Sequence, residues 1–235
     1  MRAVLVASAH LDDAVLSCGQ FLGGRPEVTV VTVFAGTPST KSVLTAYDAK
    51  TGFKSADEAM EARRAEDLEA MSVLQARAVH LDFVDSQYGG NLKASGLVKR
   101  LQELIDETHP EFVVGPLGLV HSDHEAVRDA LLEAAKDATR PVWLYEDLPY
   151  RVAAPESVPV ALDALRGHGY ELELGFIGTG PIATKMDALF CYRSQLQLPE
   201  FENRHEFLVS ERFWHVSKAV TPEASEGGDA PAQLG

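Results

Sequence analysis

Two short clusters of histidine and carboxylate residues carry the clearest chemical potential in this chain. The first is His10-Leu11-Asp12-Asp13, and the second, far along the sequence, is His121-Ser122-Asp123-His124. Two imidazoles and one carboxylate, with one coordination position left for water, form a common ligand set of a catalytic zinc. We therefore expect one divalent ion per chain, a zinc, held by His10, Asp13 and His124.

The other polar residues of the two clusters could supply acid–base chemistry. Adjacent residues point in different directions, so Asp12 and Asp13 should not both bind one ion, and Asp12 becomes the candidate general base. Zinc lowers the pKa of its water to roughly 7, and a carboxylate that accepts the proton contributes about 10²- to 10⁴-fold in rate. We expect Asp123 to hold His121 protonated, so that His121 stabilises an oxyanion or protonates a leaving amine.

Each of these residues also has a simpler structural interpretation. A lone histidine is more often a packed or surface residue than a ligand, and an Asp pair before a helix often serves only as an N-terminal cap. For Asp12 taken alone, the capping interpretation and the chemical one stay open. The occurrence of two similar clusters favours a shared site.

The elements around the clusters predict how they could meet. Short β-branched runs alternate with amphipathic helical patterns, which indicates an α/β, Rossmann-like three-layer fold with a mostly parallel sheet. The predicted strands are residues 3–7, 28–34, 78–83, 112–114 and 142–145. The predicted helices are residues 57–74 and 97–108. The clusters follow the first and fourth strands, and ligands bind beyond the carboxyl ends of such strands. A Ser122–Glu125 capping box should begin the next helix.

Composition sets the broad class of the protein. The 235 residues are 46% hydrophobic and 24% charged, as in globular proteins, and the formal net charge is −14. Such a charge disfavours nucleic acid as a partner. We expect one domain over 1–220, a disordered acidic tail over 221–235, and a long loop over 36–52 that is either a lid or a surface insertion. Without a membrane span or signal peptide, we expect a cytoplasmic protein; self-association as a homo-oligomer is left open.

The two clusters resemble the motifs of the PIG-L (LmbE-like) family of zinc-dependent N-deacetylases. The usual N-terminal motif of that family is Ala-His-Pro-Asp-Asp-Glu, and here Leu11 and Ala14 replace its proline and glutamate. The resemblance implies a Rossmann-like fold and the same zinc ligands, base and role for His121. It also implies that Arg63 and Asp85 contact the substrate. Their simpler interpretations are a helix-surface ion pair for Arg63 and a turn residue for Asp85.

The expected activity is zinc-dependent removal of an N-acetyl (or N-acyl) group from an amino sugar such as an N-acetylglucosaminyl glycoside. The family resemblance also allows an amidase that acts on a thiol-conjugate amide. A metal-dependent phosphoesterase is a third hypothesis, because paired carboxylates and histidines also occur in two-metal sites. A non-catalytic sugar-binding protein is a fourth hypothesis. Counting bound ions separates the phosphoesterase from the deacetylase, because the phosphoesterase needs two ions per chain and the deacetylase needs one.

Overall fold

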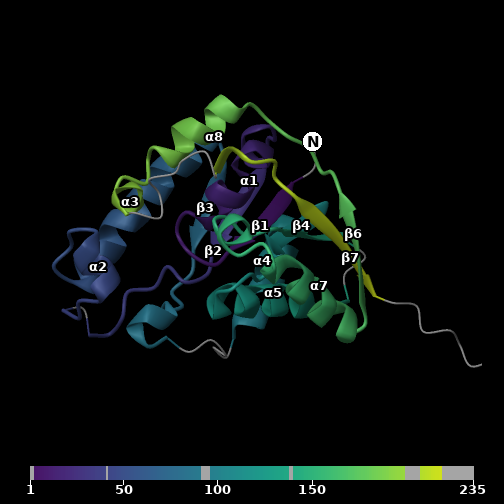
Figure 1. The fold of residues 1–235 in the computed structure, drawn as a ribbon, viewed down its shortest axis with the longest axis horizontal. Helices are drawn as coiled ribbons and strands as arrows, with labels where there is room; N and C mark the ends of the chain where they lie inside the picture. Colours follow the sequence, from purple (N-terminus) through teal and green to yellow (C-terminus); the bar gives the residue numbers. More distant parts are fainter. Residues whose placement is uncertain (1–2, 41, 91–95, 138–139, 199–206, 219–235) are drawn as a thin grey trace, which may run out of the picture.

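A seven-stranded sheet in the order β3-β2-β1-β4-β5-β7-β6 forms the centre of the molecule (Figure 1). The computed structural model describes residues 3–40, 42–90, 96–137, 140–198 and 207–218, and the expected disordered tail lies outside them. The parallel strands are β1 (Val4–Ser8), β2 (Val28–Thr32), β3 (Arg77–His80), β4 (Phe112–Pro116) and β5 (Val142–Tyr145). These five strands confirm the predicted α/β fold, with ends that differ by a few residues.

Two further strands extend the sheet beyond β5, and each runs antiparallel to the strands it pairs with. β7 (Phe213–Lys218) pairs antiparallel with both β5 and β6 (Tyr170–Gly175), so β6 forms one edge of the sheet. Neither strand is among those predicted from the sequence. In β6 the glutamates Glu171 and Glu173 are exposed and alternate with leucines, which is the pattern of a strand with one face in solvent.

Helices cover both faces of the sheet (Figure 1). One face carries α1 (Asp13–Gly23), α3 (Ala56–Leu74) and α8 (Ile182–Leu189), and the other carries α4 (Leu97–Thr108), α5 (Ser122–Ala134) and α7 (Ser157–Gly167). The remaining helices are α2 (Ala46–Lys50), α6 (Tyr150–Ala153) and the 3₁₀ turns η1 (Ser86–Tyr88) and η2 (Gln195–Gln197). Among the described helices, none is long and apolar enough to cross a bilayer.

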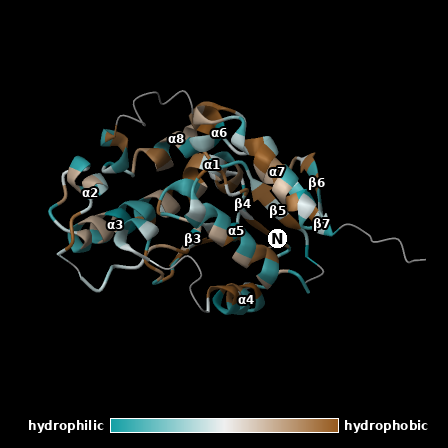
Figure 2. Ribbon diagram, turned by 60° about the horizontal axis from the view of Figure 1, so that its bottom comes forward, coloured by the Kyte–Doolittle hydropathy of each residue, from teal (hydrophilic) through white to brown (hydrophobic). Residues whose placement is uncertain are grey.

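Local signals mark the start of α3 and the end of α4, the two helices predicted from the sequence. The Ser55 hydroxyl accepts the backbone N–H of Glu58 at the start of α3, while the Glu58 carboxylate accepts the N–H of Lys54, which is a reciprocal cap. α4 ends at His109, which has a left-handed backbone conformation and precedes a proline. Figure 2 shows α4 with its hydrophobic side toward the sheet, in agreement with four buried aliphatic residues: Leu97, Leu101, Leu104 and Ile105.

β1 is the central strand and is buried on both faces. Val4 and Val6 pack with α1 and α3, whereas Leu5 and Ala7 pack with α4 and α5, which explains its continuous apolar sequence. The chain proceeds from β1 to β2 on one side, and β4 pairs with β1 on the other. The order of the strands therefore reverses between β1 and β4, and a crevice opens there at their carboxyl ends.

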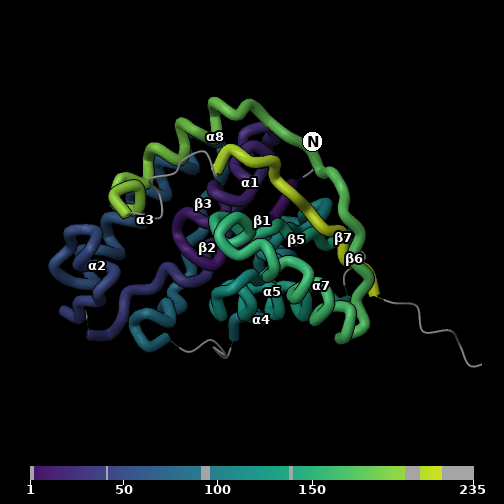
Figure 3. The backbone as a smooth tube through the Cα atoms, viewed as in Figure 1, coloured from purple at the N-terminus to yellow at the C-terminus, as the bar shows by residue number. Residues whose placement is uncertain are grey.

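The segment 36–52 is partly helical rather than irregular throughout. It contains α2, which the Thr45 hydroxyl caps by accepting the Asp48 N–H. In Figure 3, α2 lies at the end of the molecule opposite to β6 and β7. The Tyr47 hydroxyl donates to the side-chain oxygen of Gln195, and Asp48 forms an ion pair with Arg63 at 2.8 Å. These contacts dock α2 on α3 and η2.

Candidate active site

The crevice between β1 and β4 brings the two clusters together. Oδ2 of Asp13 lies 3.2 Å from Nδ1 of His10 and 3.2 Å from Nε2 of His124. These three side chains form a group whose ligand atoms all lie within 4.8 Å of one another. His10 and Asp13 are at the end of β1 and the start of α1, and His124 is in the first turn of α5. The topology thus joins residues that are far apart in the sequence.

Two further carboxylates fix the orientation of the imidazoles. Nε2 of His10 donates to Oδ2 of Asp123 over 2.9 Å, and Nδ1 of His124 donates to Oδ1 of Asp147 over 2.6 Å. When a ring is neutral, as a metal ligand must be, its proton therefore stays on the nitrogen that faces away from Asp13. The other nitrogen can then offer its lone pair to an ion beside Asp13, which is the arrangement of metal-binding histidines with outer carboxylate partners.

The residues present fit a divalent cation. Nε2 of His124 is buried and makes no hydrogen bond to the part of the chain that the structure describes. Burial disfavours charge on this ring, yet Asp13 and then Asp147 raise the pKa of His124 to about 10. The surroundings of the ring thus stabilise positive charge. Two imidazole nitrogens and a carboxylate oxygen are also the donor types that zinc prefers.

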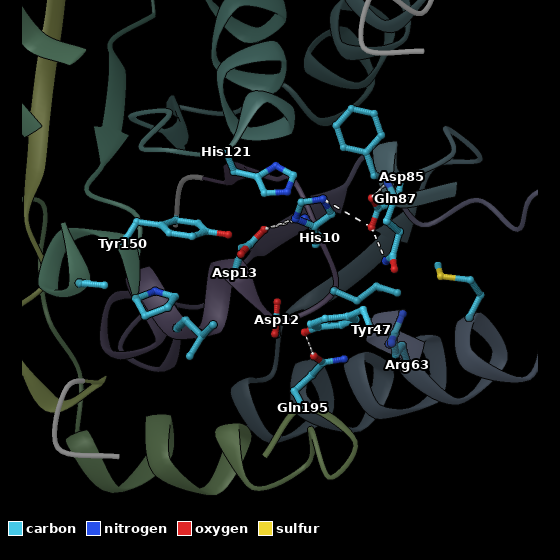
Figure 4. Close-up of a pocket in the computed structure, with 16 residues that line it drawn as sticks. His10, Asp12, Asp13, Tyr47, Arg63, Asp85, Gln87, His121, Tyr150 and Gln195 are labelled. Atoms are coloured by element: carbon cyan, nitrogen blue, oxygen red, sulfur yellow. Dashed lines mark hydrogen bonds and ion pairs between the residues drawn. The ribbon is translucent and has the colours of Figure 1, made fainter. Parts of the chain in front are cut away.

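Asp12 occupies the N-cap position of α1 without acting as a cap. Its side chain makes no capping hydrogen bond, and its backbone has φ 144° and ψ −31°, a strained conformation for a residue with a Cβ. The side chain instead lines the cavity at the candidate site, beside Asp13 (Figure 4). Burial, followed by repulsion from Asp13, raises the pKa of Asp12, which suits a group that must accept a proton near neutral pH.

The shortest contacts of Asp123 are with residues other than His121, and a role for Asp123 in holding His121 protonated stays a prediction. The Asp123 carboxylate accepts from His10 and from the Ser86 hydroxyl at 3.1 Å, and its Oδ2 is 4.0 Å from Nδ1 of His121. That Nδ1 accepts the backbone N–H of Asp123 instead. Burial, then repulsion from His10 and His124, lowers the pKa of His121. Its ring is therefore neutral near pH 7, with its proton on Nε2.

The start of α5 also differs from the prediction. The helix begins at Ser122 and its cap is the His121 side chain, so the expected Ser122–Glu125 capping box does not form. Before it, the His121 N–H donates to the Leu119 carbonyl over 2.6 Å, and the residue between them, Val120, has φ 62°. This is a γ-turn with a left-handed central residue, which is a strained conformation for a β-branched side chain.

Asp147 belongs to the site although it is not among the site residues predicted from the sequence. While Oδ1 binds His124, Oδ2 accepts the backbone N–H groups of Gly118 and Leu119 at 2.9 and 3.1 Å. Asp147 follows β5, which neighbours β4 in the sheet. Its position after a strand end was the available signal, because that rule had identified the other two clusters.

The two predicted substrate contacts have different surroundings. Arg63 is buried, pairs with Asp48, and lies 5.1 Å from the centroid of the Tyr47 ring, so it is not an exposed ion pair on the helix surface. Asp85 accepts the backbone N–H of Gln87 at the start of η1, as a turn residue would. Both side chains line the cavity, and their contact with a substrate stays a prediction.

A cavity of about 440 Å³ surrounds the candidate site. Figure 4 shows Tyr47, Arg63, Asp85, Gln87 and Gln195 on one side of Asp12 and Asp13, and Tyr150 on the other with its hydroxyl directed toward Asp13. The full set of lining residues also includes His10, Leu11, Leu16, Phe34, Met60, His121, Pro149 and Ala153. The volume is within the range of small-molecule sites.

The fold and the histidine–carboxylate cluster define an α/β protein with a candidate metal site at a sheet crevice. The profile described as PIG-L: GlcNAc-PI de-N-acetylase matches residues 5–135, and the chain therefore belongs to the PIG-L family. No curated protein sequence matches the chain.

Several solved structures share the fold. A deacetylase triple mutant of the teicoplanin biosynthetic pathway is 30% identical, with a TM-score of 0.76, over 94% of this chain and 100% of that chain. The A40926 pseudoaglycone deacetylase Dbv21 is 29% identical, with a TM-score of 0.76, over 94% and 99%. The hydratase GalB from Pseudomonas putida, at 19% identity and a TM-score of 0.57 over 97% and 100%, shares the fold alone. A shared fold does not determine function, so the function is inferred from the site.

Proposed function

We propose that this protein is a zinc-dependent hydrolase that removes the N-acetyl group from an amino sugar, such as an N-acetylglucosaminyl glycoside. The observation that carries the proposal is the convergence of His10 Nδ1, Asp13 Oδ2 and His124 Nε2, with Asp12 beside them in the same cavity. The similarity to deacetylases of the teicoplanin pathway and of A40926 pseudoaglycone supports this reaction class.

His10, Asp13 and His124 would hold the ion. When bound, the zinc would supply Lewis-acid chemistry, lowering the pKa of a water and polarising the amide carbonyl. Asp12 would accept the proton of the attacking water, and the neutral His121 would donate from Nε2 to the carbonyl oxygen as negative charge develops there. Asp12 would then return its proton to the departing nitrogen. The products are acetate and a free amine.

The polar side of the cavity would bind the sugar. Asp85 and Gln87 present a carboxylate and an amide there, and Gln195 presents a second amide from η2. These groups match the hydroxyls of a sugar ring, which both donate and accept hydrogen bonds. Arg63 would contribute at this side by contact with the sugar or by keeping α2 in place through Asp48.

The test is acetate release from N-acetylglucosaminyl glycosides. Chelation should abolish the release and added zinc should restore it, whereas Asp12→Asn and His124→Ala variants should stay inactive with zinc present. The matched controls are Asp82→Asn and His168→Ala, two exposed residues outside the cavity. Full activity in the Asp12→Asn and His124→Ala variants would rule out the proposed zinc-dependent mechanism. Amides of thiol conjugates belong in the same screen, because their acyl chemistry is the same.

We do not favour the phosphoesterase. The two groups of metal-ligating residues found among the described residues share His10, so they do not offer separate ligand sets. Two-metal sites usually use additional bridging carboxylates. Binding of two ions per chain, together with phosphatase activity, would reverse this preference.

A further inference from the structure

A buried ion pair outside the cavity joins α8 to the segment before β7. Nζ of Lys185 lies 2.9 Å from Oε1 of Glu211, and the two side chains are 0% and 5% exposed. Neither residue lines the cavity. Removing two charges from water is costly, so a buried pair of this kind needs further hydrogen bonds to its charged groups. For Glu211, these further bonds come from α1.

Glu211 binds the backbone of α1 at a break in that helix. Cys18 has φ −142° and ψ 25°, which interrupts the helical conformation within α1. In a continuous helix the N–H groups of Gln20 and Phe21 would donate to carbonyls four residues earlier. Here they donate to Oε1 and Oε2 of Glu211 over 2.8 and 2.9 Å. Glu211 is thus the N-terminal cap of the second half of α1, and its negative charge suits that end of a helix.

Packing fixes the second half of α1 in place. α8 lies along α1 (Figure 1). A Cβ atom at Gly19 would lie 2.7 Å from Cγ of Lys185, so the Lys185 side chain rests directly on the helix backbone. The Phe21 ring contacts the Phe213 ring of β7, at 5.6 Å between centroids. Any straightening of α1 would therefore move its first half, residues 13–17.

The first half of α1 belongs to the candidate metal site. It begins with Asp13, whose Oδ2 accepts the backbone N–H of His10 over 2.7 Å. It ends with Ser17, whose hydroxyl accepts the N–H of Leu148, the residue after Asp147, over 3.0 Å. The direction of this short segment therefore sets the position of Asp13 relative to the two histidines.

Building on the proposed function, we propose that Lys185 and Glu211 are positioning residues for the metal ligand Asp13. Glu211 holds the break in α1 by accepting the two N–H groups that the break leaves free. Lys185 supplies the positive charge that keeps the Glu211 carboxylate in the core. The break directs the first half of α1 into the crevice while the second half stays packed on α8. Loss of the pair should therefore weaken metal binding, although neither residue lines the cavity.

The zinc affinity of two variants tests this role. Lys185→Met keeps the carbon chain that rests on Gly19 and removes the charge, so the affinity, measured by chelator competition, should fall by about tenfold. The double variant Lys185→Met/Glu211→Gln leaves neither charge of the pair unpaired in the core, so it should fold even if the single variant does not. Its amide has one accepting oxygen for two N–H groups, so the same loss of affinity is expected.

Two controls separate positioning from a general loss of stability. Leu165→Ala removes buried carbon in α7, on the other face of the sheet, and Arg193→Met removes an exposed ion pair with Glu69. Both should leave the zinc affinity unchanged. The visible absorption of the cobalt-loaded protein depends on coordination geometry, so it should change in the double variant and stay the same in Leu165→Ala.

The outcomes distinguish the positioning role from the proposed function. Wild-type zinc affinity and an unchanged cobalt spectrum in the double variant would overturn the positioning role and leave the proposed function standing. No zinc binding by the wild-type protein, or zinc binding that His124→Ala does not weaken, would overturn both.

Discussion

His124 and Asp147 are joined by a hydrogen bond of 2.6 Å between Nδ1 and Oδ1, at a point where both side chains are buried. The second oxygen of Asp147 binds the backbone of Gly118 and Leu119. One carboxylate therefore holds a candidate metal ligand and the turn that leads to His121. Metal binding and oxyanion stabilisation should both depend on this one residue.

Replacing Asp147 tests this dependence. Asp147→Asn keeps the shape of the side chain and removes its charge, so His124 loses the partner that orients it and increases its basicity. Loss of such an outer partner lowers metal affinity by about 10- to 100-fold. Competition with a chromogenic chelator measures the zinc affinity, with Asp163→Asn, an exposed carboxylate of α7, as the control. An affinity within twofold of the wild-type value would contradict the prediction.

Asp12 should matter for the rate and little for metal binding. In Asp12→Asn no carboxylate is present to accept the proton of the attacking water, so kcat should fall by about 10²- to 10⁴-fold. The zinc affinity should change by less than about tenfold, because Asp12 is not one of the proposed ligands. Steady-state kinetics on metal-saturated protein measures the first effect. An equal loss of zinc affinity and rate would show that Asp12 is itself a ligand.

The strained turn at Val120 predicts opposite effects on stability and activity. A β-branched residue at φ 62° stores on the order of 1–3 kcal/mol, so Val120→Gly should raise the free energy of unfolding by about 1 kcal/mol. The same change loosens the turn that orients His121, so kcat should fall severalfold. Val120→Asn, which tolerates positive φ, should keep more of the activity. Urea unfolding and kinetics measure both. A glycine variant that is less stable and fully active would contradict the role of the turn.

The stability of the metal-free protein should fall as pH rises. Burial opposes charge on His124, but Asp13 and Asp147 raise its pKa to about 10, above a value of about 6.5 in the unfolded chain. The folded state therefore holds this proton more tightly. The resulting stabilisation is complete below about pH 6.5 and is lost as pH rises toward 10. Urea midpoints in the presence of a chelator should decline over this range, and by less in His124→Gln. An equal decline of the urea midpoint in the wild-type protein and in His124→Gln would show that the His124 proton is not the cause.

The sequence predicted the elements that have strong patterns and the residues that follow them. The strands β1 and β2 consist largely of buried aliphatic and β-branched residues because both of their faces are covered. The clusters after β1 and β4 meet because parallel strands end at one edge. The edge strand β6 was missed, since its glutamates face solvent and it packs on one side.

The partners within the site were harder to predict, because they depend on side-chain direction. Asp123 is close to His121 in the sequence, but from the first turn of α5 its carboxylate reaches His10 across the crevice. No sequence spacing links Asp147 to His124. Their hydrogen bond forms because β5, which precedes Asp147, lies beside β4. Pairing across the sheet, rather than along the chain, therefore determines these partners.

Stepwise addition of zinc to the metal-free protein, with acetate release measured at each step, tests the central claim most directly. If His10, Asp13 and His124 share one ion, activity should rise linearly and reach a plateau at one equivalent of zinc per chain. Acetate release that is already complete in the chelated protein would contradict the account, as would activity that first appears during addition of a second equivalent.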